Sequence, residues 1–553
     1  MSEAELEHKA EERELPPSAE ELEAREEEEE SIELDDRARF HIRVLLLSIL
    51  LVALCSITYE LIIGTVSSYL LGNSVYQFSL TIGLYMSAMG VGSYLSKFIK
   101  RNLLENFFWV ELSVGVLGGI SSALLFGVFT FTPYFQPAMW AITLGIGTLV
   151  GLEIPLLTRY VRRYAHLREA LANVLSWDYI GALLGSLAFP LLLLPVLGLL
   201  NSAAVVGLIN VAVAGMGLYA FRKELKNRAT LTIGVVLAAI LLGSIFFTSG
   251  AYERFLDKRL FQDPVVYREQ TPYQKLTMTA WRGKDYRLYI NGNIQFSSVD
   301  EYRYHEALVH VPMSLVPNVR KVLILGGGDG LVVKQLREHY KEVEEIVMVD
   351  LDPRMTELAK SHPTLRRING GAMDDERLEV VNDDAMNYVM DTKKRFDVII
   401  IDLPDPNNES LSKLYSVEFY RLIRNRLQDN GVMVTQSSAV YFAPNSFWSI
   451  HRTIEAAFCP DEKGCAGEDQ HVVPYHTWIP SFGDWGFNLA SKQPLEPAKW
   501  KLEVPDAKYV DTDGLVAMLH FPRDVGEREV KINRLIEPVL LTYYINDWHK
   551  HNQ

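Results

Sequence analysis

Five aspartates and a glycine-rich loop are the residues of this sequence whose types and spacing best suggest chemistry. Asp329 lies within the loop Gly326-Gly327-Gly328-Asp329-Gly330, and the other four acids, which follow short apolar runs, are Asp350, Asp384, Asp402 and Asp405. Glycines let a backbone approach a ligand closely, and an acid after the second strand of such a unit can accept hydrogen bonds from ribose hydroxyls. Together these features predict a ligand that contains adenosine.

The density of acids narrows the chemical class of that ligand. A cofactor that carries phosphates would be repelled by a cluster of carboxylates, whereas a cationic sulfonium and a protonated amine would be attracted by it. The sequence therefore favours a sulfonium compound over a nicotinamide dinucleotide, and it predicts a cationic second substrate.

The elements that must position these acids can be read from the apolar runs. The runs Lys321 to Leu325, Ile346 to Val349, Phe396 to Ile401 and Gly431 to Gln436 predict strands that alternate with helical patterns. Such an alternation is typical of a doubly wound parallel sheet, which binds ligands at the carboxyl ends of its strands. We therefore expect an α/β domain over residues 318–553, with the acids and the glycine loop at one edge.

A smaller β-domain is predicted just before this α/β domain. Leu276 to Trp281 and Arg287 to Phe296 read as strands, and the second run folds back at Asn291-Gly292, a strong hairpin signal. We expect residues 251–317 to comprise a linker and this small β-hairpin domain.

The glycine loop is similar to the signature loop of spermidine synthases, which transfer an aminopropyl group from decarboxylated S-adenosylmethionine to putrescine. The resemblance includes the membrane-fused branch of that family, and it implies a Rossmann-like fold of the S-adenosylmethionine-methyltransferase type. Its other motifs, in chain order, are Tyr273-Gln274, Asn291-Gly292 with Gln295, Asp300 to Glu306, Leu414 to Tyr420, Asn533-Arg534-Leu535 and Tyr543-Tyr544.

The resemblance implies a role for each matching position. Asp402 would be the general base, and decarboxylated S-adenosylmethionine would be a co-substrate, with no permanently bound cofactor. The residues implied to bind that co-substrate are Gln274, Gly326, Gly327, Gly328, Asp329, Asp350, Asp384 and Ala385. The residues implied to bind the amine are Tyr304, His305, Asp329, Asp405 and Gln436. The ordinary alternatives are turn, cap or solvated roles for the aspartates and a packed core role for His305.

Three features depart from the family pattern. The chain has Asp402-Leu403-Pro404-Asp405 where the family usually has small hydroxyl residues between the acids, and it has Glu409 where a proline is usual. Phe482 stands where family members often have a tyrosine that contacts substrate. Both acids remain, so catalysis is expected, while the identity of the acceptor amine stays open between putrescine, a longer polyamine and another diamine.

Residues 43–250 predict an all-helical, multi-pass transmembrane domain. A span needs ~20 predominantly apolar residues, and about seven segments qualify: 44–66, 76–98, 106–132, 135–157, 177–200, 202–221 and 229–250. Basic residues gather in alternate loops, which predicts a cytoplasmic N-terminus and a location in the cell membrane. Seven spans would then place the catalytic domain outside, although its co-substrate is made in the cytoplasm. Either one segment is re-entrant or split, or catalysis occurs outside.

Four carboxylates lie within or at the ends of these segments: Glu60, Glu111, Glu153 and Asp178. Intramembrane carboxylates are costly and often functional, so a polyamine-conducting or polyamine-sensing role is one hypothesis. The alternative is that they lie near the interface and pair with arginines, as Glu153 could with Arg159.

Charge and cysteines set further bounds. The net charge of −15 argues against a nucleic-acid partner, and the acidic residues 1–42 are expected to form a disordered tail. Three cysteines provide no metal site of the paired-cysteine type. Cys459 and Cys465 either form one local bridge or remain free thiols. The partners expected are a lipid bilayer and, by family precedent, a second copy of the chain.

Three functions compete at this stage. The leading one is a membrane-bound aminopropyltransferase that forms spermidine and methylthioadenosine. The second is a polyamine transporter or sensor whose soluble domain binds without turnover. The third is a small-molecule methyltransferase, which would need the adenosine-binding half of the site and not the paired acids Asp402 and Asp405.

Overall fold

The computed structural model describes residues 36–162, 167–261, 263–459 and 470–551. Within these residues the chain forms two compact units. The helical unit comprises the described parts of Met1–Ile63, Thr81–Leu125 and Tyr134–Ser249, and the α/β unit comprises those of Gly64–Leu80, Phe126–Pro133 and Gly250–Gln553.

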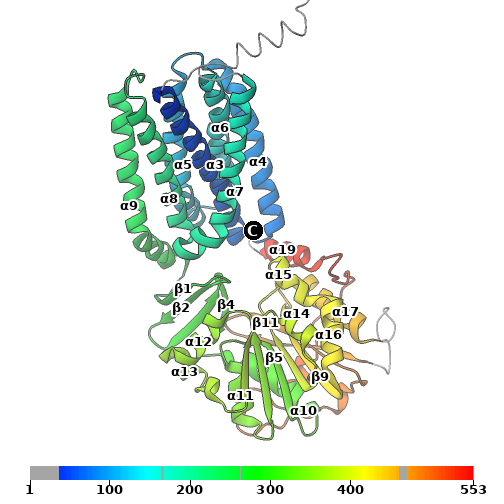
Figure 1. Cartoon of the computed structure of the whole chain (residues 1–553). Coiled ribbons are helices and arrows are strands. Elements are labelled where there is room, and N and C mark those ends of the chain that lie inside the picture. The colour runs from blue at the N-terminus through cyan, green and yellow to red at the C-terminus, as the bar shows by residue number, and fades with distance from the viewer. Residues whose placement is uncertain (1–35, 163–166, 262, 460–469, 552–553) are drawn as a thin grey trace, which may run out of the picture. The chain divides into compact units, whose positions relative to one another are not determined.

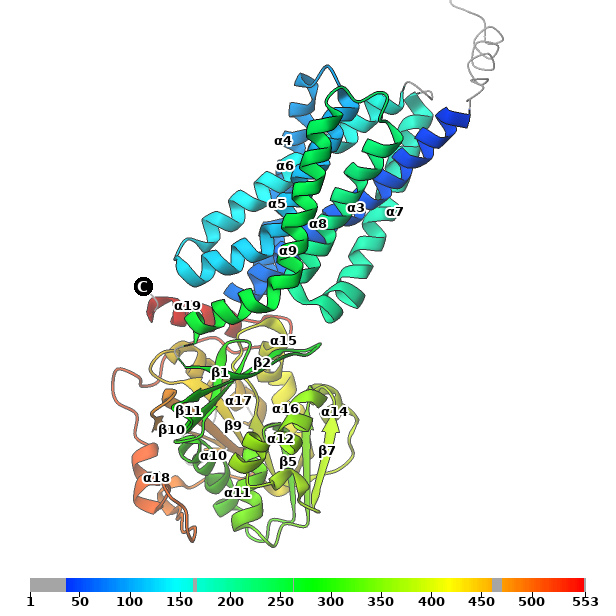
Figure 2. The ribbon, with the colours of Figure 1, turned by 90° about the vertical axis from the view of Figure 1, so that its left-hand side faces the viewer.

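The helical unit is a bundle of long apolar helices (Figures 1 and 2). Its elements are α3 (Asp36–Leu71), α4 (Ser74–Leu95), α5 (Leu103–Phe131), α6 (Phe135–Val161), α7 (Leu167–Ala188), α8 (Leu194–Ala220) and α9 (Arg228–Leu260), with a π-helical turn at Phe189–Leu193. Among the described residues, six helical segments are long and apolar enough to cross a membrane.

One of these six segments, Leu171–Ala220, contains two of the predicted spans. It is 50 residues long and is interrupted at Gly198, whose φ of 71° is not helical. A straight helix of that length would measure about 75 Å, more than twice the ~30 Å hydrocarbon core of a bilayer. The interruption falls near the boundary between the predicted segments 177–200 and 202–221, so the number of crossings stays a prediction.

Two helices of the helical unit extend past the predicted segment boundaries. Helix α3 begins at Asp36, so the last residues of the predicted tail are helical, and its side chain His41 is buried. The remainder of that tail, residues 1–35, lies outside the described residues. Helix α9 continues to Leu260, ten residues beyond the predicted end of the last span at 250. In both cases polar residues extend an apolar helix, and an apolar window cannot detect such an extension.

The small β-domain is a four-stranded antiparallel sheet in the order β1-β2-β3-β4. Its strands are Val265–Gln270, Lys275–Trp281, Asp285–Ile290 and Asn293–Ser297. The predicted hairpin at Asn291-Gly292 is confirmed, and both residues have positive φ values of 50° and 84°. A two-residue turn of this kind needs left-handed backbone at both positions, which Asn and Gly tolerate.

The α/β unit is built on a seven-stranded sheet in the order β10-β11-β9-β8-β5-β6-β7. Its strands are β5 (Lys321–Gly326), β6 (Glu345–Asp350), β7 (Leu378–Asn382), β8 (Phe396–Asp402), β9 (Leu427–Ala439), β10 (Val472–Ile479) and β11 (Gly483–Ser491). Five strands are parallel, including the four that were predicted, whereas β10 and β11 are added to the sheet as antiparallel strands. Strand β7 was not predicted, because it is an edge strand whose residues are all at least partly exposed and so form no apolar run.

Helices cover both faces of this sheet (Figures 1 and 2). Alternate residues of β5 face opposite cores: Val322 packs with residues of α10 and α11, and Leu323 packs with residues of α14, α16 and α17. The helices of the unit are α10 (Glu301–Leu315), α11 (Leu331–His339), α12 (Pro353–Ser361), α13 (Pro363–Ile368), α14 (Ala385–Asp391), α15 (Glu409–Ser412), α16 (Val417–Arg426), α17 (Pro444–Phe458), α18 (Thr512–Met518) and α19 (Leu540–His551). The doubly wound architecture is therefore as predicted.

Candidate active site

The predicted acids gather where the strand order reverses. Strands β5 and β8 are neighbours in the sheet, with Gly326 opposite Asp402, although other strands and helices separate them along the chain. In doubly wound sheets, ligands bind outside the carboxyl ends of the strands at such a switch point. Strands β5, β6, β7 and β8 all end at this edge, and Asp329, Asp350, Asp384, Asp402 and Asp405 are each partly exposed there.

The glycine loop has a conformation that a side chain would prevent. Gly326 and Gly327 have φ values of 85° and 63°, and a Cβ at Gly326 would lie 2.1 Å from the carbonyl oxygen of Asp402. A Cβ at Gly328 would lie 2.4 Å from Oδ2 of Asp350. The loop thus brings the ends of β5, β6 and β8 together more closely than any other residue type would allow.

Asp402 is oriented by a tyrosine from helix α10. The hydroxyl of Tyr304 donates to Asp402 Oδ1 at 2.6 Å, whereas Oδ2 faces the glycine loop, 3.3 Å from where a Cβ of Gly327 would be. Burial raises the pKa of Asp402, and His305 and the Tyr304 hydrogen bond partly oppose that rise. The arrangement leaves one carboxylate oxygen free for a ligand.

His305 and Asp329 form the neighbouring part of the site. Nδ1 of His305 lies 3.0 Å from Oε2 of Glu301, whose other oxygen accepts from Lys334 at 2.9 Å. Burial would lower the pKa of His305, but Glu301 raises it to about 9. Asp329 accepts from the backbone N–H of Leu331 at 2.9 Å, and burial raises its pKa to about 6, with His305 opposing and Asp402 adding to that rise.

Asp350 is linked to Gln274 through a residue that the sequence analysis did not single out. The backbone N–H of Asp352 donates to Asp350 Oδ1 at 2.9 Å, and Asp352 accepts from Gln274 Nε2 at 3.0 Å. Burial raises the pKa of Asp350 to about 6. Asp352 also caps helix α12. In the sequence, only its position two residues after Asp350 indicates that it belongs to the site.

Asp384 is a helix cap with a cationic partner. Its Oδ1 accepts from the backbone N–H of Met386 at 2.8 Å at the start of α14, and its Oδ2 accepts from Lys413 Nζ at 2.7 Å. Burial would raise its pKa, but Lys413 and the backbone N–H groups lower it overall. Ala385, the first residue of that helix, is buried. The sequence left helix capping as an alternative to ligand binding for the aspartates, and Asp384 does cap a helix.

Asp405 is surrounded by three donors. Gln436 Nε2 lies 3.4 Å from its Oδ1, and the hydroxyls of Ser438 and Tyr544 donate to its Oδ2 at 3.2 Å and 3.1 Å. Burial raises the pKa of Asp405 to about 6 despite these hydrogen bonds. A carboxylate has about four acceptor positions, so one position remains for a ligand.

Sequence reasoning missed Ser438, Tyr544 and Tyr415 as site residues. Ser438 has a φ of 70°, which is unusual for a residue other than glycine. The hydroxyl of Tyr415 lies 2.6 Å from Gln436 Nε2 and donates to the carbonyl of Pro404 at 3.0 Å. Tyr415 and Tyr544 both lie in motifs that the resemblance covered, but only the folded chain brings them beside the loop between the two acids.

An aromatic wall borders Tyr304. The ring centroids of Phe482 and Phe487 lie 5.8 Å and 5.5 Å from that of Tyr304, and Trp485 lies 5.3 Å from Phe482. Phe482 therefore supplies packing where a tyrosine would add a hydroxyl. Glu409, the other departure from the family pattern, is the first residue of the short helix α15.

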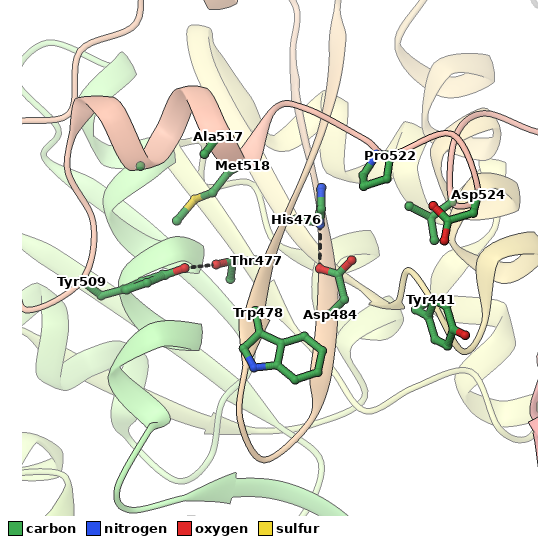
Figure 3. Close-up of a pocket in the computed structure, with 12 residues that line it drawn as sticks. Tyr441, His476, Thr477, Trp478, Asp484, Tyr509, Ala517, Met518, Pro522 and Asp524 are labelled. Atoms are coloured by element: carbon green, nitrogen blue, oxygen red, sulfur yellow. Dashed lines mark hydrogen bonds and ion pairs between the residues drawn. The ribbon is translucent and has the colours of Figure 1, made fainter.

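A cavity of about 530 Å³ beside β10 and β11 does not contain these acids (Figure 3). At its centre Nδ1 of His476 lies 2.6 Å from Asp484, and its Nε2 donates to the carbonyl of His520 at 2.9 Å. Both ring nitrogens are occupied, so this histidine serves as a structural ion pair rather than as an acid or base for the sheet-edge site.

The described residues hold no candidate metal group, and the two described cysteines differ in state. Within the described residues, no group of His, Cys, Asp and Glu has the arrangement needed to hold a metal ion. Cys55 is a buried free thiol, and Cys459 is disulfide-bonded. Cys465, the partner considered for it, lies outside the described residues.

The chain is similar to several known proteins. Residues 301–498 match the family described as the spermine/spermidine synthase domain. The chain is 39% identical over 509 residues to the polyamine aminopropyltransferase of Leptospira interrogans, covering 92% of this chain and 99% of the relative. It is 42% identical over 518 residues to polyamine aminopropyltransferase 2 of Ralstonia nicotianae, covering 92% and 98%. A solved structure titled spermidine synthase in complex with the transition-state analogue AdoDATO is 29% identical, has a TM-score of 0.41, and covers 47% of this chain and 86% of its own.

These similarities decide between the functions that the sequence left open. Relatives about 40% identical over nearly their whole length are aminopropyltransferases by name, and the range that matches the family domain includes Tyr304, the glycine loop, Asp402 and Asp405. They support neither a methyltransferase nor a protein that only binds polyamine. The chain belongs to the spermine/spermidine synthase family and is a polyamine aminopropyltransferase.

Proposed function

We propose that this chain is a membrane-bound aminopropyltransferase that transfers the aminopropyl group of decarboxylated S-adenosylmethionine to putrescine or a related diamine. The observation that carries the proposal is the pair Asp402 and Asp405 after strand β8, each held by one tyrosine hydroxyl and each with an acceptor position left for a ligand. The products would be spermidine, when putrescine is the acceptor, and methylthioadenosine.

Asp402 would act as the general base. An alkyl amine has a pKa of about 10, so it arrives protonated and cannot attack until a proton is removed. Asp402 Oδ2 faces the glycine loop, and the raised pKa of this carboxyl makes it a stronger base than an ordinary aspartate. The amine nitrogen would then form a bond to the carbon next to sulfur as the carbon–sulfur bond breaks, with its electron pair returning to sulfur and the proton held on Asp402.

The donor would lie along the edge formed by β5, β6 and β7. Asp350 is placed to accept from ribose hydroxyls, with Gln274 positioned through Asp352. Asp329, whose partner Leu331 leaves the second carboxylate oxygen free, would accept from the ammonium of the aminopropyl group. Gly326, Gly327 and Gly328 provide the close approach, and Ala385 is the buried residue beside the expected adenine position.

The acceptor would lie along the loop between the two acids. Its reacting nitrogen would approach Asp402 and Tyr304, with His305 close by, and its distal ammonium would approach Asp405. Gln436 supports this end because it donates to both Leu403 and Asp405. Aligning two charged substrates in this way can contribute several kcal/mol to the rate acceleration.

The membrane location rests on the helical unit. Its six segments of suitable length and composition, together with the alternating basic loops, support a multi-pass protein of the cell membrane. A homodimer is a prediction from family precedent.

Product analysis tests the proposal. Purified full-length protein in detergent would be given decarboxylated S-adenosylmethionine and a panel of diamines of increasing length. Appearance of methylthioadenosine with an extended amine supports the proposal and identifies the acceptor. Transfer to an acceptor without a second ammonium, at the same efficiency as to a diamine, would contradict the role given to Asp405.

A further inference from the structure

The helical unit contains a second group of polar side chains that aminopropyl transfer does not use. Tyr59 of α3, Glu111 of α5 and Asn210 of α8 are 0% exposed, and Glu153 of α6 is 3% exposed. The four residues come from four helices of one bundle (Figures 1 and 2). Glu60 and Asp178, the other acids noted in the apolar segments, are only partly buried.

The four side chains interact with one another. The carboxyl groups of Glu111 and Glu153 are within hydrogen-bonding contact, and Asn210 Nδ2 donates to Glu111 Oε2 at 3.3 Å. The hydroxyl of Tyr59 interacts electrostatically with both acids. Glycines permit this approach, since a Cβ at Gly115 would lie 2.9 Å from Asn210 Cβ.

The cluster lacks the partners that buried polar atoms normally have. Glu111 Oε1, Glu153 Oε1, Asn210 Oδ1 and the hydroxyl of Tyr59 have no hydrogen-bond partner within the described part of the chain. Arg159, the partner first considered for Glu153, instead donates to the backbone carbonyls of Pro155, Ile99 and Ser96. The interface-pairing explanation of Glu153 is therefore wrong.

Two buried carboxyls in contact cannot both stay ionised unless a cation neutralises them. An isolated buried carboxylate is so costly that proteins pair it or protonate it. The three unpartnered acceptor oxygens, on Glu111, Glu153 and Asn210, equal in number the three N–H donors of a primary ammonium group. Ca²⁺ would need six to eight oxygens and Mg²⁺ a near-ideal octahedron, so an ammonium fits this donor set better than either metal ion.

We propose that Glu111, Glu153 and Asn210 form a binding site for a primary ammonium group of a diamine or polyamine, separate from the sheet-edge site. When no amine is bound, a proton shared by the two carboxyls supplies the positive charge. Entry of the ammonium releases that proton, so the net charge of the cluster is unchanged. The site gives the helical unit a ligand of its own, and this function does not depend on the transfer reaction.

The test measures amine binding with the sheet-edge site disabled. Equilibrium binding of radiolabelled putrescine and spermidine would be measured on full-length protein in detergent, carrying Asp405→Asn. Glu111→Gln and Glu153→Gln would each be added to this background, because both changes keep size and remove charge. Glu105→Gln, which alters another buried acid of α5, is the matched control.

We expect the Asp405→Asn protein to retain saturable amine binding. Glu111→Gln and Glu153→Gln should each weaken it about tenfold or more, as loss of one partner of a buried charge pair does, while Glu105→Gln should not. Each variant is to elute as the parent does in gel filtration, and Asn210→Leu provides a further variant if one fails to fold. Retained affinity in both glutamine variants, or no saturable binding in the Asp405→Asn protein, would overturn the proposal and leave the carboxyls holding a proton only.

Discussion

The two groups of acids in this molecule are held in opposite ways. At the sheet edge, Asp402 and Asp405 are partly exposed, and donors such as Tyr304 and Tyr544 fix them while leaving acceptor positions open. In the helical unit, Glu111 and Glu153 are almost fully buried and contact each other, and one oxygen of each has no hydrogen-bond partner among the described residues. Carboxyl groups thus lie in a partly exposed, oriented site in one unit and in a buried cluster in the other.

The two environments suit the carboxyl groups to different functions. An oriented carboxylate with an open oxygen can exchange ligands quickly and take a proton from one of them, which suits catalysis. A buried pair of carboxyls must be neutralised by protons or by a bound cation, and a choice between the two suits selective binding. Water access and hydrogen-bond donors, rather than the acidic residue itself, determine which of these behaviours is expected.

The rate of aminopropyl transfer should fall most when the proposed general base, Asp402, is replaced. Asp402→Asn keeps the Tyr304 contact possible but removes the base, so transfer should fall about 10²–10⁴-fold. Release of methylthioadenosine under saturating substrates measures this effect. Asp383→Asn alters an exposed acid beside Asp384 and should leave the rate unchanged. A rate for Asp402→Asn within a few-fold of the parent would show that this acid is not the base.

A smaller effect is expected at the distal acid. Asp405→Asn removes the charge proposed to hold the far ammonium, so the KM for the diamine should rise about 100-fold, consistent with loss of a buried charge partner. The KM for decarboxylated S-adenosylmethionine should change little, because Asp405 contacts Gln436, Ser438 and Tyr544 and no residue of the donor edge. Steady-state kinetics with each substrate varied separately distinguishes these outcomes, and an equal rise in both KM values would contradict the assignment.

Tyr544 tests whether orientation matters as well as charge. Tyr544→Phe removes one donor to Asp405 while keeping the ring, and the KM for the diamine should rise about tenfold, as expected for a hydrogen bond to a charged group. Tyr543→Phe is the matched control, since the Tyr543 hydroxyl accepts from the backbone of Lys531 instead. Equal effects of the two changes would mean that Tyr544 acts only through packing of α19.

The smallest effect concerns stability without ligand. The folded pKa of Asp405 is raised to about 6, above the ~3.9 of an unfolded aspartate, so its ionised form opposes folding as pH rises through that window. Asp405→Asn should therefore stabilise the free protein by about 1 kcal/mol at pH 8, a value reduced for solvent screening of a partly exposed group. The gain should shrink towards pH 5, where the wild-type carboxyl is protonated. Unfolding midpoints of the variant and the parent at pH 8 and pH 5 measure this gain in stability. A gain that is larger at pH 5 than at pH 8 would contradict the raised pKa of Asp405.

Much of the fold was accessible from local pattern. The apolar runs that became β5, β6 and β8 and the Asn291-Gly292 hairpin have strong periodic or turn signals. Strand β7 lacked such a signal because an edge strand has no need of a continuous apolar run. The antiparallel strands β10 and β11 were also missed, since direction is a property of pairing between strands and not of either segment.

Local sequence patterns also predicted the acids of the site, but not the side chains that donate hydrogen bonds to them. Asp329, Asp350 and Asp402 lie within or directly after the elements that position them, so their placement at one edge follows from strand order and chain direction. The donors Ser438 and Tyr544 lie on other elements, and their contacts with Asp405 depend on packing across the sheet.

The sequence alone predicts the two kinds of unit, a cationic ligand and the acids expected to bind it, because hydrophobic period, turn residues and charge are local properties. Only the tertiary structure decided that Asp384 is a helix cap, that Tyr544 holds Asp405, and that Glu111 meets Glu153 and Asn210. Those contacts join residues from different helices and strands. Their geometry is fixed by the packing of whole elements against one another, which no single segment encodes.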